Sequence, residues 1–221
     1  MCFSANASFG AGVVLSVIGV VSIKKAHKPS QLLFASIPLI FAVQQVAEGI
    51  LWVTLPNLDN VATQRIATYT FLFFAQILWP LWVPVAIILL EKNSTRKKVQ
   101  KILIGAGIIV GFYLAYCLLS YQIQAKIIGH HIAYIQNYPA SLRIYVIGLY
   151  ALATIAPPFF SHIKRMWMLG VAVLISYLIT ALFYEHYILS VWCFFSSIIS
   201  ISVYAIMIEI SNSKQQIAPV W

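Results

Sequence analysis

Two amides and a carboxylate stand close together at Gln44, Gln45 and Glu48, inside a long apolar stretch of the chain. Residues four apart lie on one face of a helix, so Gln44, Glu48 and Trp52 form a single stripe with Gln45 on its flank. An ionisable group in an apolar helix is costly to bury, and its presence there indicates a functional site. We therefore predict that these side chains, with Trp192 at a comparable depth, bind a ligand.

Thiol and imidazole groups elsewhere in the chain could add a metal to this site. Cys2, Glu48, His131 and Cys193 together have the donor types of a tetrahedral zinc or copper site. If Met1 is removed, Cys2 also carries a free α-amine, which could instead activate the thiol as a nucleophile. No Cys-x-x-Cys or His-x-x-x-His spacing accompanies them, so the metal prediction depends on the four residues meeting in space.

The composition indicates which kind of fold must position these groups. Hydrophobic residues make up 62% of the 221 residues and charged residues only 9%, whereas soluble domains carry about 25% charged residues. A bilayer core needs roughly 20 apolar residues per helix, because every backbone amide must be satisfied within the helix. We predict an all-α membrane protein, a single domain of seven transmembrane helices near residues 5–23, 31–55, 63–90, 102–121, 143–162, 166–183 and 187–210.

Positive charge orients this bundle. Eleven of the fourteen lysines and arginines fall in alternate connections or in the tail after the last predicted helix. Because positive residues near helix ends are retained in the cytoplasm, we predict an outside amino terminus and a cytoplasmic carboxyl terminus. The scattered cations favour contact with anionic lipid of the bilayer over binding to nucleic acid, which we exclude.

In this topology the scarce polar residues collect toward the outer face. Glu48 lies about seven residues, or roughly 10 Å, below the outer surface at 1.5 Å per residue. The connection over residues 122–142 is expected to lie at the membrane surface as a cap over the bundle. Small residues at fourfold spacing predict helix packing seams at Ser8, Gly12 and Ser16 and at Gly107 and Gly111.

The opening Met-Cys-Phe-Ser-Ala resembles the start of a family of uncharacterised bacterial integral membrane proteins. The resemblance implies a bacterial source, one multi-helix domain and an inner-membrane location, and it implies no activity. Further similar points are spread over nearly the whole chain: Gln44, Gln45, Glu48, Gly49, Trp52, His131, Tyr134, Trp192, Cys193, Phe194 and Phe195.

Three functions remain open from the sequence, and whether the protein is an enzyme is left undecided. The first is binding of a metal or a small molecule for sensing or catalysis. The second is proton-coupled transport of a small molecule, with Glu48 as the proton carrier and Gln44, Gln45 and Gln76 along the path. The third is a scaffold that binds another membrane protein through the small-residue seams. A purely structural role of Glu48, as a carboxyl that joins two helices, is the competing interpretation.

Overall fold

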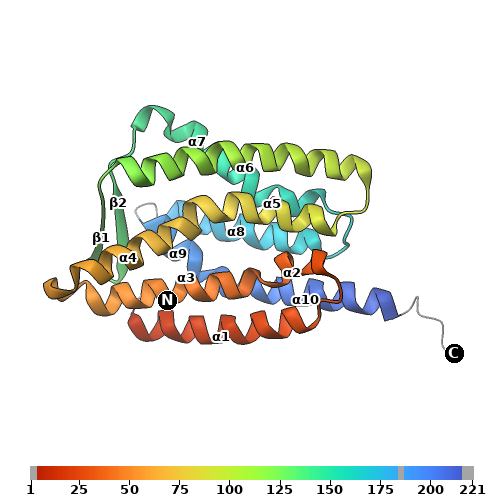
Figure 1. Ribbon diagram of the computed structural model, residues 1–221, viewed down its shortest axis with the longest axis horizontal. Helices are drawn as coiled ribbons and strands as arrows, with labels where there is room; N and C mark the ends of the chain where they lie inside the picture. Colours follow the sequence, from red (N-terminus) through yellow and green to blue (C-terminus); the bar gives the residue numbers. More distant parts are fainter. Residues whose placement is uncertain (1–3, 184–186, 216–221) are drawn as a thin grey trace.

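The computed structural model describes residues 4–183 and 187–215, and within them the chain is predominantly helical (Figure 1). Helices overlap all seven predicted ranges. Five helical stretches are long and apolar enough to cross a bilayer, and two shorter apolar helices lie in the remaining two ranges. The helices are α1 (Ala5–Lys24), α2 (Pro29–Ala35), α3 (Ile37–Thr54), α4 (Val61–Leu72), α5 (Trp79–Leu90), α6 (Ser94–Ser120), α7 (Arg143–Ile155), α8 (Met166–Phe183), α9 (Ile188–Phe194) and α10 (Ser196–Gln215).

Proline residues set several of the helix boundaries. Pro29 and Pro38 lie in the first turns of α2 and α3, so the predicted helix over 31–55 is divided at Ser36. Pro157 opens the short 3₁₀ turn η4 (Pro157–Phe160), and α7 ends two residues earlier at Ile155. Proline lacks an amide hydrogen and its ring collides with the carbonyl four residues back, which ends a helix or forces it to change pitch.

A π-helical segment, η2 (Phe73–Leu78), joins α4 to α5 in one continuous rod. Its wider turn is seen in the amide of Trp79, which donates to the carbonyl of Phe74 five residues back. Pro80 follows immediately, and the wider turn moves the carbonyl of Gln76 away from the proline ring. The segment therefore lets the rod pass Pro80 without a break.

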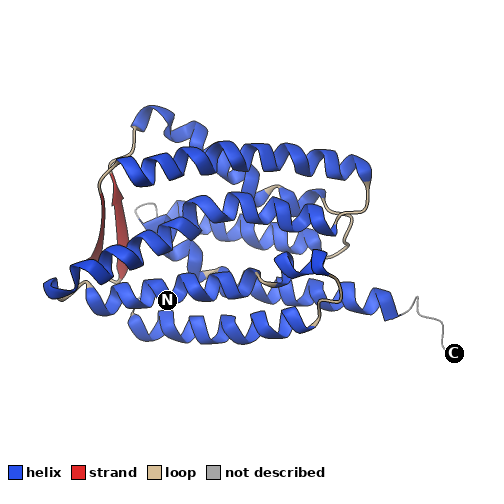
Figure 2. Cartoon of the chain, viewed as in Figure 1, coloured by secondary structure: helices blue, strands red, loops and turns tan. Residues whose placement is uncertain are grey.

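The connection over residues 122–142, which was predicted to lie outside the helices, contains a β-hairpin that was not predicted. Strands β1 (Ile123–Ile128) and β2 (His131–Gln136) pair antiparallel, with Ile128 opposite His131. Gly129 takes the positive φ of 61° that the tight turn requires. Side chains along β1 alternate between half-buried and exposed, which is the period of a strand with one covered face. Figure 2 shows the hairpin standing across one end of the helices.

Two helix pairs are in close contact at glycines. On α1, the buried face runs through Ser8, Gly12 and Gly19 and packs along α3, where a Cβ at Gly19 would meet Leu39 at 2.5 Å. On α6, a Cβ at Gly107 would come within 2.0 Å of the carbonyl oxygen of Pro80. Both predicted small-residue seams are therefore occupied by helices of the same chain.

The two ends of the bundle differ in charge and in packing. The links that carry Lys25, Lys92 and Arg165 lie at the end where α10 finishes, and the hairpin lies at the opposite end (Figure 1). In the half toward the basic links, the interior is filled by the largest apolar cluster of the described residues: Phe34, Ala35, Ile37, Trp79, Ala86, Ile87, Leu90, Met166, Leu169, Ile199, Val203, Ile206 and Met207.

Candidate functional site: a polar stripe beside an aromatic cavity

The polar residues predicted on one helix face lie on α3 and are buried. Gln44, Gln45 and Glu48 expose 0%, 1% and 0% of their surface. The amide of Gln45 donates to the carboxyl of Glu48 at 3.4 Å. Three polar side chains withdrawn from water within two turns of one helix cost free energy unless other groups hydrogen-bond them.

Glu48 is held by a residue that the sequence analysis did not name. The hydroxyl of Ser190, at the start of α9, donates to the other carboxyl oxygen of Glu48, and Ser190 is itself fully buried. One signal could have identified Ser190: it is a hydroxyl residue in the first turns of the last predicted helix, at the same depth as Glu48. This contact joins the polar stripe of α3 to α9.

Gln44 makes the corresponding contact with α5. The indole nitrogen of Trp79 donates to the side-chain oxygen of Gln44 at 3.0 Å. The Trp79 ring also stacks on Phe41, with 4.1 Å between ring centroids. Gln44 thereby fixes the orientation of an indole that would otherwise bury an unsatisfied N–H.

Trp192 is fixed in a similar way on α9. Its indole nitrogen donates to the hydroxyl of Ser176 at 3.0 Å. Its ring meets Tyr150 and Tyr177 edge-on, with centroid distances of 5.9 and 5.5 Å. Tyr150 in turn donates to the backbone carbonyl of Ala75. The sequence analysis placed Trp192 near Glu48 but missed these tyrosines.

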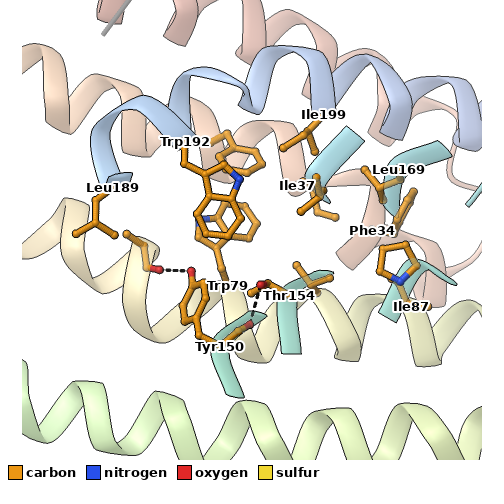
Figure 3. Close-up of a pocket in the computed structure, with 15 residues that line it drawn as sticks. Phe34, Ile37, Trp79, Ile87, Tyr150, Thr154, Leu169, Leu189, Trp192 and Ile199 are labelled. Atoms are coloured by element: carbon orange, nitrogen blue, oxygen red, sulfur yellow. Dashed lines mark hydrogen bonds between the residues drawn. The ribbon is translucent and has the colours of Figure 1, made fainter. Parts of the chain in front are cut away.

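Trp79 and Trp192 are two walls of a cavity between α3, α5, α7, α8 and α9, which we call the inner cavity (Figure 3). Its volume is about 70 Å³. In Figure 3 the tryptophans and Tyr150 stand toward the Leu189 end, and Phe34, Ile87 and Leu169 close the other end. The full lining is Phe34, Ile37, Phe41, Ala75, Trp79, Val83, Ile87, Tyr150, Thr154, Pro158, Leu169, Val173, Leu189, Trp192 and Ile199.

Trp52 lies away from the inner cavity. It packs beneath the hairpin, in a cluster around Leu51, Ala67 and Ile132. Its indole nitrogen is buried and has no hydrogen-bond partner among the described residues. The structure therefore does not bring Trp52 together with Trp192, although both were predicted to bind the same ligand.

His131 begins β2, and its ring stacks on Tyr187 with 4.6 Å between centroids. Burial lowers the pKa of the imidazole, which favours its neutral form. Tyr187 precedes Ser190 by three residues, so the start of α9 contacts both His131 and Glu48. No sequence pattern indicated this shared neighbour beyond the predicted outer placement of all three residues.

The predicted metal set cannot be assembled from the described part of the chain. Cys2 lies outside the described residues, and so does the side chain of Cys193. Among the residues that are described, no group of three or more His, Cys, Asp or Glu side chains is arranged to hold a metal ion. The zinc or copper site of Cys2, Glu48, His131 and Cys193 therefore stays a prediction.

Gln76, proposed as part of a transport path, is buried under the hairpin end of the bundle. Its amide donates to the side chain of Gln136 at 3.0 Å, and its oxygen accepts from Tyr138 at 3.1 Å. Burial raises the pKa of the Tyr138 hydroxyl, so it remains a hydrogen-bond donor at neutral pH. Gln76 thus ties η2 to the hairpin.

A second buried carboxylate, Glu91, was not predicted. It accepts hydrogen bonds from the backbone amides of Lys92, Asn93 and His162, and it lies 2.8 Å from Nδ1 of His162. Burial alone would raise the pKa of this carboxyl, but the backbone amides and the charge of His162 outweigh it and hold the pKa below its usual range. Glu91 therefore fastens the α5–α6 link to the link before α8.

Comparison with known proteins gives a family but no activity. A family model described as a family of unknown function (DUF6629) matches residues 1–218. No curated protein and no solved structure matches the chain.

Proposed function

We propose that this chain, which belongs to that family of unknown function, is a membrane protein that binds an apolar small molecule in the inner cavity. The observation that carries the proposal is the pair of hydrogen-bonded indoles, Trp79 and Trp192, in the cavity wall. Rigid aromatic side chains in a concave, mostly apolar site are typical of small-molecule binding sites. Sensing or catalysis would then involve the buried polar residues Gln44, Gln45 and Glu48, of which Gln44 hydrogen-bonds Trp79 in the cavity wall.

The topology belongs to the same proposal. All seven predicted ranges would cross a bacterial inner membrane, with the basic links in the cytoplasm and the hairpin outside. Its support is the concentration of basic links at one end of the bundle in Figure 1, since positive charge marks cytoplasmic loops. Single cysteines replacing Lys25 and His130, in a chain whose own cysteines are serine, test it in whole cells. A membrane-impermeant maleimide should label position 130 and spare position 25, and the reverse pattern would overturn the topology.

Binding is favoured over transport by the packing of the basic half. The apolar cluster around Phe34, Ile87 and Met207 occupies the interior of that half, and such packing favours a closed site over a polar path from Glu48 toward the basic links. A scaffold role has less support, because the seams at Gly12 and Gly107 already pack against α3 and α5. Metal binding remains open as a prediction, and elemental analysis of the purified protein, with Cys2→Ser and Glu48→Gln variants, tests it.

The binding proposal is tested by photolabelling in lipid nanodiscs. The probe is a long-chain hydrocarbon that carries a diazirine; light releases dinitrogen from it and leaves a carbene that inserts into neighbouring C–H bonds. We expect labelled peptides from α5 and α8, identified by mass spectrometry. Val83→Phe and Val173→Phe fill the cavity from two different helices and should reduce this labelling severalfold.

Two substitutions of the same kind on the outer faces of these helices serve as controls. Leu89→Phe in α5 and Ile175→Phe in α8 add volume at residues that are 44% and 50% exposed. Both should keep the labelling of the unmodified protein. Equal labelling in all four variants would overturn the proposal, because it would show contact with bulk lipid only.

A further inference from the structure

A second cavity lies between the hairpin, α6 and α7, and we call it the outer cavity. Its volume is about 500 Å³. It is lined by Tyr113, Leu114, Ile132, Tyr134, Gln136, Tyr138, Pro139, Ala140, Arg143, Val146, Ile147, Tyr187 and Leu189. It differs from the inner cavity in chemistry, because four tyrosines, an amide and a guanidinium contribute to its wall.

The start of α9 separates the two cavities. Tyr187 lines the outer cavity, Trp192 lines the inner cavity, and Leu189 lines both. Leu189 also packs against the cluster of Phe71, Leu72 and Ala75, which holds it between the two spaces. A single apolar side chain therefore stands where one cavity meets the other.

Gln136 presents an unused donor in the outer cavity. Its side-chain oxygen accepts from Gln76, while its amide nitrogen is buried and finds no acceptor among the described residues. A buried donor without a partner is destabilising, and a ligand oxygen placed there would accept its hydrogen bond. Gln136 therefore points to a ligand group that accepts hydrogen bonds.

The charge of the outer cavity lining indicates the charge of the ligand group that would bind there. Arg143 brings a positively charged guanidinium to the same lining as the Gln136 amide. Guanidinium groups bind carboxylates and phosphates through paired hydrogen bonds. An anionic head with oxygen acceptors fits this wall, and an ammonium head does not.

We propose that the two cavities form one site for a single-chain amphiphile, whose anionic head is bound at Gln136 and Arg143 and whose apolar chain passes Leu189 into the inner cavity. This inference rests on the proposed function, since it requires an apolar ligand in the inner cavity. The shared chemistry of the head is a carboxylate or a phosphate, as in a fatty acid or a lysophospholipid.

Three diazirine probes with the same chain test it in nanodiscs: the headless hydrocarbon, the corresponding fatty acid and the corresponding lysophosphatidate. Gln136→Leu and Arg143→Gln should reduce inner-cavity labelling by a headed probe about tenfold, the loss expected for one charge-assisted hydrogen bond. Leu189→Trp, which blocks the passage, should have the same effect. The headless probe should label the Gln136 and Arg143 variants as it labels the unmodified protein.

Matched controls remove the same groups from the exposed surface. Gln124→Leu changes an amide on β1, and Arg65→Gln removes a charge from α4 at the same end of the molecule. Neither should alter the labelling by any probe. The probe whose labelling responds to Gln136→Leu identifies the source of the head, carboxylate or phosphate.

Two outcomes would contradict this inference while leaving the proposed function intact. In the first, the fatty-acid and lysophosphatidate probes label the inner cavity, but Gln136→Leu, Arg143→Gln and Leu189→Trp leave that labelling unchanged. In the second, these two probes label only residues of the outer cavity. By contrast, the proposed function itself would be refuted if the headless hydrocarbon probe labelled the cavity-filling Val83→Phe and Val173→Phe variants as strongly as it labels the unmodified protein.

Discussion

The hydroxyl of Ser190 donates a hydrogen bond to the buried carboxyl of Glu48, and this contact joins α9 to α3 inside the bundle. The two residues are 142 positions apart in sequence. The same short helix carries Trp192 into the inner cavity and Leu189 between the two cavities. The position of the cavity wall therefore depends on a polar contact that lies behind it.

Removing the hydroxyl of Ser190 should destabilise the protein. In Ser190→Ala one buried carboxyl oxygen loses a donor, which costs about 1–3 kcal/mol. The free energy of unfolding, measured by denaturant titration in mild detergent, checks this. Ser120→Ala, at an exposed site at the end of α6, is the control and should change stability by less than about 0.5 kcal/mol. Equal effects of the two substitutions would contradict the role of Ser190.

Gln44 and Trp79 should be energetically coupled. In a double-mutant cycle with Gln44→Leu and Trp79→Phe, either single change removes the same hydrogen bond. The sum of the two single-mutant losses in unfolding free energy should therefore exceed the loss in the double mutant by about 0.5–3 kcal/mol. Unfolding free energies of the four proteins give the coupling. The pair of Gln124→Leu with Trp79→Phe should be additive, because Gln124 is exposed on β1. Additivity of the Gln44 cycle would show that the indole contact does not stabilise the fold.

Two glycines in α6 should respond in opposite ways to the same substitution. A Cβ at Gly107 would meet the carbonyl of Pro80, so Gly107→Ala must separate α6 from α5 and should cost about 1–3 kcal/mol. A Cβ at Gly105 meets nothing within 4 Å. Gly105→Ala should leave stability unchanged or raise it by up to about 1 kcal/mol, because alanine favours a helix. Thermal unfolding in detergent measures both, and a loss at Gly105 as large as at Gly107 would refute the packing argument.

Glu91 should make stability fall in acid. Its pKa is lower in the folded protein than the ordinary value of 4.5, so its contribution is complete above that ordinary pKa and is lost as the pH falls through the folded-state value. Glu91→Gln should lower the melting temperature at neutral pH and flatten its decline in acid. Melting temperatures measured across acidic and neutral pH test this. Asp59→Asn, at an exposed carboxylate, should keep the original pH dependence, and an identical acid decline in Glu91→Gln would exclude Glu91 as the cause.

The sequence predicted the helical class and the buried stripe because both follow from local rules. Apolar stretches of membrane-spanning length predict helices, and fourfold spacing placed Gln44 and Glu48 on one face of α3. The partners of that stripe could not be predicted. Ser190 and Trp79 reach it through the packing order of the helices, and helical periodicity contains no information on which helices are neighbours.

The hairpin was missed for a different reason. The apolar composition of this segment favours a cap at the membrane surface, whereas the alternation along Ile123, Ala125 and Ile127 has the period of a strand. A Gly at position 129 between two such runs is the usual sign of a tight hairpin turn. Pro38, Pro80 and Pro157 each lie within a predicted transmembrane range, where proline disrupts helical hydrogen bonding. The structure shows a different result at each: a break between α2 and α3 before Pro38, the π segment before Pro80, and the end of α7 before Pro157.

The hydrogen bond between Trp79 and Gln44 depends on the π-helical pitch of η2, which comes directly before Trp79. A π turn accommodates one residue more than an α turn over nearly the same rise. If the same six residues from Phe73 to Leu78 adopted regular α-helical pitch instead, α5 would rotate by about 100° relative to α4. Trp79 would then face away from α3, although no residue in contact with it had been replaced. The helical pitch of six residues thus sets the direction in which an entire helix presents its side chains.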